Sequence, residues 1–240
     1  GLPVSKFAAL VRDTINHSMK YSARSAFAAE KKIGVSDIGH CREYTRRMIV
    51  GEDFTDEQDD YLAAFIGTAV GDRTEDAIVA RAGGVKQMEV TVQLEIGEGY
   101  VLNLVGHPDL VFPLEPAQGT VLPEGAMAIT NVLYEGKTKD GLGVVKRYGA
   151  QTNHKYQATL YAKALIDMGV LDENATLVLA YIDRSGSDPH PYIEEWTYDP
   201  AILEEAMAWF QDVLYAVAHG EEASKDKPRD WCLSYCEYAT

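Results

Sequence analysis

Two acidic residues and a lysine in the middle of the chain have the types and spacing of a hydrolytic metal site. Asp109 follows an apolar run over Tyr100–Val105, and Glu135 and Lys137 follow a second run over Ile129–Tyr134. Both runs are bounded by Gly and Pro and have the length of strands. Hard cations such as Mg²⁺ take carboxylate oxygens together with water and substrate phosphate. The pattern therefore predicts a divalent-cation site whose lysine orients a water or stabilises charge on a phosphoryl group.

Side-chain alternation along a strand decides which of these groups can meet. Glu135 and Lys137 point to the same face, and Gly136 between them can offer its backbone carbonyl as another ligand. If the two strands pair, Asp109 meets Glu135 near one edge of the sheet. In the alternative interpretation, Asp109 is a turn residue after Pro108. Glu135 and Lys137 would then form an exposed ion pair that contributes little to stability.

A helix predicted over Gln151–Met168 carries two further polar candidates. Gln157 and Tyr161 are four residues apart, so on a helix they share one face and can reach the same site. Gln157 could hydrogen-bond the carboxylates or a phosphate, and Tyr161 could do the same or stack on a base. The alternative is an ordinary amphipathic helix without a direct role.

These motifs together resemble the PD-(D/E)XK nuclease superfamily, and within it the RecB-type branch that includes the CRISPR-associated exonucleases. Gly106 to Asp109 matches motif II, and Glu135-Gly136-Lys137 matches motif III. Gln157 and Tyr161 match the QxxxY motif of that branch. The resemblance covers roughly residues 67–161, and more loosely residues 36–236.

The first motif of the family departs from its usual pattern here. Gly67 to Glu75 resembles the GxxxHxxxE motif, but Gly71 stands where the family has a metal-binding His. Glu75 is retained, with a solvated helix acid as its alternative reading. His107, beside Asp109, could replace the missing His, although alternation points it to the opposite face.

The resemblance implies an activity and a set of roles. Mg²⁺ or Mn²⁺ would be held by Asp109, Glu135 and the Gly136 carbonyl, and Lys137 would position the attacking water. Gln157 and Tyr161 would order the site, with Glu75 acting through a water. The expected protein is a metal-dependent DNA exonuclease that acts on single-stranded DNA or DNA ends. Its expected processes are recombination, repair, or phage- and CRISPR-related DNA processing.

Three cysteines, Cys41, Cys232 and Cys236, are too few for a secreted disulfide scaffold. The resemblance to iron–sulfur members of the branch implies that they are ligands of a [4Fe–4S] cluster, which usually needs four thiolates. The fourth ligand would then lie beyond Thr240, or the cluster would be absent. A Zn²⁺ site completed by His40, and a plain buried thiol at Cys41, are the other interpretations.

The net charge of −15 argues against a protein that coats nucleic acid with a broad basic surface. One strip is locally basic, because six Lys and Arg but only Asp140 among the acids lie in residues 137–163. Such a strip predicts contact with a phosphate backbone, or alternatively a solvated helix face. No apolar run is long enough to span a membrane, so a soluble cytoplasmic protein is expected.

The expected fold is α/β: a restriction-endonuclease-like central mixed sheet flanked by helices, with a helical N- and C-terminal cap. Helices are expected over 5–25, to about 50 from a cap at Ser36 or Asp37, and over 61–81, 151–168 and 201–219. Strands are expected over 85–96, 100–105, 129–134, 175–182 and 192–198, and residues 141–149 are expected to form a flexible loop. The expected domains are a helical part over 1–60, a nuclease core over 61–220 and a cysteine-bearing tail over 221–240.

Two alternatives remain open at this stage. A non-catalytic module with a nuclease-like fold would bind DNA ends or a protein partner, and the replacement at Gly71 favours it. An enzyme that acts on RNA cannot be separated from a DNA nuclease, because the metal chemistry does not involve the 2′-hydroxyl. A protein partner or a homo-oligomer is compatible with either.

Overall fold

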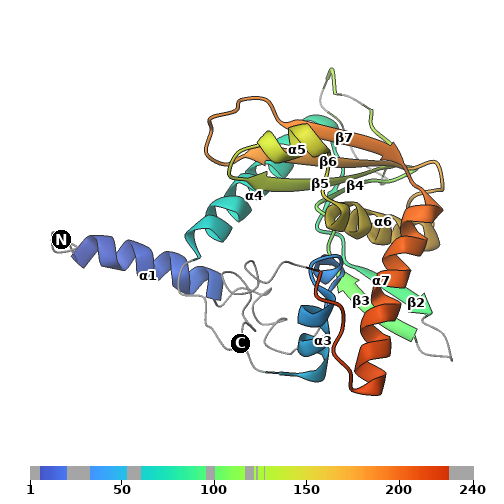
Figure 1. The fold of residues 1–240 in the computed structure, drawn as a ribbon. Helices are drawn as coiled ribbons and strands as arrows, with labels where there is room; N and C mark the ends of the chain where they lie inside the picture. Colours follow the sequence, from blue (N-terminus) through green and yellow to red (C-terminus); the bar gives the residue numbers. More distant parts are fainter. Residues whose placement is uncertain are drawn as a thin grey trace.

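The computed structural model describes residues 6–20, 33–52, 61–95, 101–116, 122, 124–126 and 128–226. Its central feature is a mixed five-stranded sheet with the order β1-β4-β5-β6-β7 (Figure 1). The strands are β1 (Val85–Lys86), β4 (Leu110–Phe112), β5 (Val132–Lys139), β6 (Thr176–Asp183) and β7 (Tyr192–Thr197). Neighbouring strands pair in antiparallel fashion except β5 and β6, which run parallel. The helix-flanked mixed sheet confirms the predicted fold class.

Helices cover both faces of this sheet. The helices that the structure describes are α1 (Lys6–Lys20), α3 (Arg42–Val50), α4 (Leu62–Ala82), α5 (Gly143–Tyr148), α6 (Thr152–Asp167) and α7 (Pro200–His219), with a 3₁₀ turn η1 at Val35–Asp37. Of these, α1 packs on α4 and α3 packs on α7 rather than on the sheet. One face packs its alternate residues, such as Leu133 and Leu177, against α6 and α7. The other face packs Tyr134 and Ala180 against α4. The two-residue period of β5 and β6 therefore sends successive side chains to different helices.

A second, two-stranded sheet corrects the prediction for residues 85–105. The expected strand over 85–96 is two strands, because β1 belongs to the central sheet and β2 (Val90–Glu95) pairs with β3 (Val101–Gly106). β2 alternates buried and exposed residues, as predicted for a half-buried strand. The run before Asp109 is therefore not the neighbour of β5. That neighbour is β4, which begins directly after Asp109.

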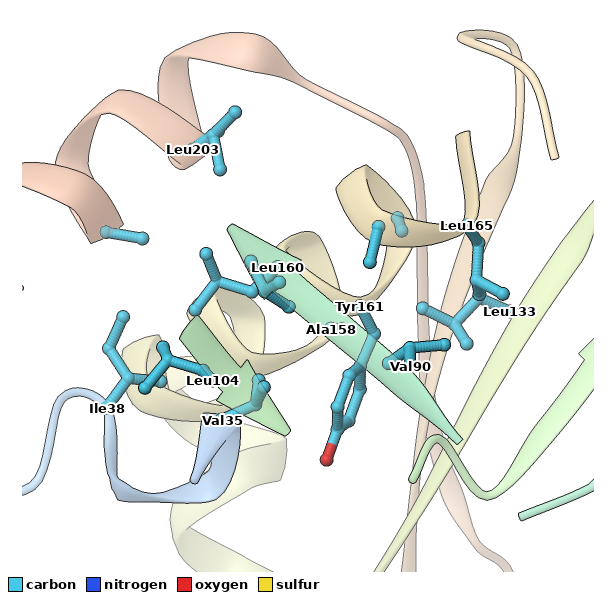
Figure 2. Close-up of a cluster of buried hydrophobic side chains, with 14 of the residues drawn as sticks. Val35, Ile38, Val90, Leu104, Leu133, Ala158, Leu160, Tyr161, Leu165 and Leu203 are labelled. Carbon is cyan, nitrogen blue, oxygen red and sulfur yellow. The ribbon is translucent and has the colours of Figure 1, made fainter. Parts of the chain in front are cut away.

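The largest core lies between α6, α7 and the β2–β3 sheet (Figure 2). Leu160 and Leu104 are fully buried there, and Val35 and Ile38 of the η1 segment close its side. At about 25 cal/mol per Å² of buried apolar surface, residues of this size each contribute about 2 kcal/mol to stability. This packing fixes the orientation of α6 relative to the central sheet.

Two further expectations are corrected. The helix that ends at Val50 begins at Arg42 with Cys41 as its N-cap, rather than being capped at Ser36 or Asp37. The expected loop over 141–149 contains α5, because buried Val145 packs on Leu179 and Tyr181 of β6. Six residues do not form a stable helix alone, so this turn depends on tertiary packing.

The segment after α7 returns to α3. The Glu43 carboxylate is buried and accepts hydrogen bonds from Arg46, Arg47 and the Ala223 N–H. These partners lower the pKa of Glu43 to about 2, although burial alone would raise it. A buried ion cluster thus joins α3 to the segment that follows α7. In the described part of the chain, no helix is both long and apolar enough to cross a membrane.

Candidate active site

The predicted site residues come from three elements that meet at β5, the middle strand of the central sheet. Asp109 immediately precedes β4, and Glu135 and Lys137 lie on β5. Gln157 and Tyr161 lie one turn apart on α6. Glu135 and Lys137 share the face of β5 that α6 covers, so hydrogen bonds connect all five residues.

The strand register places the two carboxylates side by side. Leu110 lies opposite Tyr134, so the next position along brings Asp109 beside Glu135. The Asp109 N–H donates to Glu135 Oε1 at 3.0 Å, and the Gly136 N–H donates to Asp109 Oδ2 at 2.8 Å. Each carboxylate is therefore held by backbone from the other's strand, which fixes the separation of the pair.

Burial raises the pKa of both carboxyl groups and so disfavours their ionised forms. Glu135 is 1% exposed, and burial together with the neighbouring Asp109 raises its pKa to about 7, against the opposing effect of Lys137. Burial also raises the pKa of Asp109, which the Lys137 charge and the Gly136 N–H counteract. Like charges at this separation repel strongly in a low-dielectric site. A bound cation would relieve that repulsion.

This electrostatic strain predicts a pH dependence for the metal-free protein. A carboxyl whose pKa is higher in the folded state than the usual 4.5 favours folding when protonated, and this contribution is lost as the pH rises towards about 7. In EDTA, we therefore expect the free energy of unfolding of Glu135→Gln to increase relative to that of the wild type as the pH rises from 4.5 to 7. The gain should be on the order of 2–3 kcal/mol. Chemical denaturation at several pH values measures it, and a constant difference would contradict it.

A hydrogen-bonded relay connects Lys137 to α6. Lys137 Nζ donates to Glu135 Oε2 and to Gln157 Oε1, both at 3.0 Å. Gln157 Nε2 then donates to the Tyr161 hydroxyl at 3.3 Å. The amide oxygen thus contacts the ammonium rather than a carboxylate, and this bond helps to fix the position of Lys137. The i, i+4 spacing that predicted a shared face is what makes the relay possible.

Tyr161 cannot stack on a base, which corrects one of its two suggested roles. Its side chain is 3% exposed, and its ring lies in the core cluster with the hydroxyl directed away from it (Figure 2). The backbone of His107 also hydrogen-bonds this hydroxyl. A Cβ added at Gly106 would lie 2.4 Å from the ring, so only glycine leaves room for Tyr161.

Glu75 on α4 approaches the pair from the other face of the sheet. It is 5% exposed, and burial and the Asp109 charge raise its pKa. A Cβ added at Gly71 would lie 3.8 Å from Glu75 Oε1, an ordinary contact, so the space at this position does not require glycine. The side chain of His107 lies beside Glu89, with its Nε2 3.4 Å from Glu89 Oε2.

The donor set suits a hard divalent ion. In the ranges that the structure describes, no three His, Cys, Asp or Glu side chains form a preassembled metal cage. Mg²⁺ nevertheless commonly uses only one or two carboxylates, with water and substrate phosphate as the remaining ligands. Asp109 and Glu135 provide such a pair, and the Gly136 peptide is held beside it by its bond to Asp109. The residues therefore fit Mg²⁺ or Mn²⁺.

Of the three cysteines predicted as cluster ligands, only Cys41 lies among the described residues. Cys41 is buried with a free thiol at the start of α3. Cys232 and Cys236 lie outside the described residues, so the cluster and the Zn²⁺ alternative with His40 both stay predictions. The contacts of Arg42 with Asp226 and of Glu43 with Ala223 hold residues 223–226 against the helix that Cys41 caps.

The predicted basic strip is largely neutralised. Three of its lysines form ion pairs with acids: Lys146 with Asp188, Lys155 with Glu194 and Lys163 with Asp167. Lys137 donates a hydrogen bond to Glu135, and Lys139 donates one to Gln151. The Arg147 guanidinium lies over the Tyr148 ring. Local acids thus remove much of the positive charge that the strip suggested for binding phosphate.

Two groups near the site were missed by the sequence analysis. The His154 Nδ1 lies 2.8 Å from the Tyr181 hydroxyl, and burial together with Lys137 lowers the pKa of this His to about 3. It is therefore neutral at physiological pH. Gln87, directly after β1, hydrogen-bonds Asp109. Neither position belongs to a motif, and only the pairing of distant segments brings them to the site.

No protein-family model and no curated protein matches this sequence. Among solved structures, the fold is similar to "Crystal structure of SSO0001", with a TM-score of 0.62 and 15% identity over 98% of this chain and 95% of that one. The LHK-Exo complex with dAMP gives a TM-score of 0.45 at 13% identity, covering 82% and 94% of the two chains. The alkaline exonuclease LHK-Exo from Laribacter hongkongensis gives 0.44 at 12%, covering 82% and 93%. The first likeness concerns the fold alone, and the other two are too weak to support an argument.

Proposed function

We propose that this protein is a divalent-metal-dependent nuclease that hydrolyses phosphodiester bonds. The observation that carries the proposal is the fixed triad of Asp109, Glu135 and Lys137, in which two adjacent carboxylates lie beside one half-buried ammonium. Burial and the neighbouring Asp109 charge raise the pKa of Glu135 to about 7, and a cation would offset the repulsion between the two carboxylates. This arrangement costs stability in the metal-free protein, as functional sites often do.

Each residue has a role in this proposal. Asp109 and Glu135, with the Gly136 carbonyl, would hold Mg²⁺ or Mn²⁺. When bound, the ion would neutralise phosphate charge and lower the pKa of a water. Lys137 would donate a hydrogen bond to the attacking water or a phosphoryl oxygen, and Gln157 would aim it.

The order of the motifs along the sequence, rather than the geometry of the site, supports a more specific proposal for the substrate and the type of nuclease. We propose a DNA exonuclease of the RecB or CRISPR-associated type, which acts on single-stranded DNA or DNA ends in repair, recombination or phage-related processing. Residues 61–220 would be the nuclease core, with 1–60 and 221–240 as its cap. Cys41, Cys232 and Cys236 would contribute to a [4Fe–4S] cluster that joins the two ends and takes no part in hydrolysis.

A nuclease-like binding module is the second candidate, and one observation favours it. Hydrogen bonds from Gln87, Gly136, Lys137 and the Asp109 N–H engage all four oxygens of the Asp109 and Glu135 carboxylates. A metal must therefore displace or share these bonds. DNA binding without cleavage in any metal would support the module.

The test is hydrolysis of a 5′-labelled single-stranded oligonucleotide by purified protein in Mn²⁺, Mg²⁺, Ca²⁺ or EDTA. We expect shortening in Mn²⁺ and Mg²⁺ and none in EDTA, with the activity coeluting with the protein on gel filtration. An RNA oligonucleotide and a duplex with recessed ends tested in parallel identify the substrate class. Intact DNA under all metal conditions, with or without DNA binding, would defeat the nuclease proposal.

A further inference from the structure

Gln87 has a backbone conformation that its residue type disfavours. Its φ is +49°, in the left-handed region that glycine adopts freely and other residues rarely do. Among the described non-glycine residues, only Asn131 shares a positive φ. Such strain persists where surrounding contacts over-determine it, and it often marks a functional position.

The contacts that hold Gln87 all lead to the acidic residues of the site. Its backbone N–H donates to the Asp109 carbonyl oxygen at 3.2 Å, and its Nε2 donates to Asp109 Oδ1 at 3.3 Å. The same side chain hydrogen-bonds Glu75 on α4. An amide NH₂ carries two donors, so one group can serve both acids.

The neighbouring residue strengthens this connection. Lys86 Nζ lies 3.6 Å from Glu75 Oε2 and 2.7 Å from Asp76 Oδ1. Glu75 Oε2 is buried without a hydrogen bond, so Lys86 is its nearby charge partner. Lys86 at the end of β1 and Gln87 directly after it thus join an acid of α4 to the acid that precedes β4.

We propose that Gln87 is a positioning residue of the candidate active site, whose amide fixes the Asp109 carboxylate and links it to Glu75 for binding a divalent ion. This inference rests on the proposed function of the site. Gln87 is exposed, so replacing it leaves the core packing intact. Partners that orient a metal ligand typically change affinity or activity by about 10–100-fold when removed.

The decisive variant is Gln87→Gly, because glycine relieves the backbone strain while removing the amide. We expect its thermal unfolding midpoint to equal or exceed that of the wild type. Its Mn²⁺ affinity, measured by titration calorimetry, should fall by about 10–100-fold. The kcat for oligonucleotide hydrolysis should fall while the KM for DNA stays the same. Gln87→Asn keeps a short amide and should recover part of the loss.

Gln93→Ala, on the exposed side of β2, is the matched control and should behave as wild type. A Gln87→Gly protein with wild-type Mn²⁺ affinity and kcat overturns this inference alone. A raised KM with unchanged kcat and Mn²⁺ affinity also overturns it, because Gln87 would then be a DNA contact. A wild-type protein that binds no Mn²⁺ overturns this inference together with the proposed function.

Discussion

Replacing Lys137 with alanine is expected to slow Mn²⁺-dependent hydrolysis of single-stranded DNA by about a thousandfold. Lys137 Nζ lies 3.0 Å from Glu135 Oε2 and from Gln157 Oε1, so its position is fixed at the carboxylate pair. A preorganised donor of this kind acts on charge that develops in the transition state. Single-turnover cleavage of a labelled oligonucleotide measures the rate, and calorimetry with Mn²⁺ measures binding separately.

The loss should lie in the rate rather than in folding. Without the ammonium, Glu135 would be left buried beside Asp109, and the pKa of Glu135, already about 7, should rise further. Protonation then avoids most of the cost of an unpaired buried charge. Lys163→Ala, which removes an exposed partner of Asp167 on α6, is the control and should retain full activity. Wild-type rates in Lys137→Ala would exclude the assigned role.

The sequence was sufficient to place Glu135 and Lys137 together because their spacing is local. Glu135, Gly136 and Lys137 are consecutive, and the two-residue period of a strand alone puts the first and last on one face. Gln157 and Tyr161 follow from helical periodicity in the same way. The ends of α3 and α7 agree with the expected ones, and Gly51 and Gly220, which follow them, adopt the left-handed conformation that ends a helix.

The partners of each strand could not be predicted in the same way. Apolar alternation describes β2 and β3 equally well as members of the central sheet or of a separate pair. The three residues of β4 are too few to give a pattern of their own, yet they place Asp109 beside Glu135. The same applies to α5, where Val145 becomes helical because β6 supplies a surface to bury it. These outcomes depend on contacts between distant segments.

Ion pairs between segments that are distant in the sequence could not be predicted either. Residues 137–163 contain six basic residues, but Asp188 and Glu194, which neutralise two of them, come from β7 and the segment before it. Charge counting along a window cannot include such partners. The Glu43 cluster could not be predicted for the same reason, because the Ala223 N–H that donates to the Glu43 carboxylate lies 180 residues away. Predictions of a phosphate path from local charge therefore need the tertiary structure.

Replacing Gly106 with alanine is expected to lower the free energy of unfolding by about 3 kcal/mol. The added Cβ would lie 2.4 Å from Tyr161 Cε1, within a cluster where neither β3 nor α6 can move easily. Relief by rotating the tyrosine would break its bond to Gln157 and loosen Lys137, so activity should fall with stability. Urea denaturation and oligonucleotide cleavage measure the two effects.

A double-mutant cycle separates this clash from a general intolerance of alanine. Tyr161→Leu removes the ring that the new methyl group meets, so adding Gly106→Ala to it should cost less than about 1 kcal/mol. Gly143→Ala, in α5, is the matched control: a Cβ there meets nothing within 4 Å, so this change should be neutral or slightly stabilising. Equal costs of Gly106→Ala in the presence and absence of Tyr161 would place the strain elsewhere. The close approach of Gly106 to Tyr161 would then have no part in holding the relay that aims Lys137.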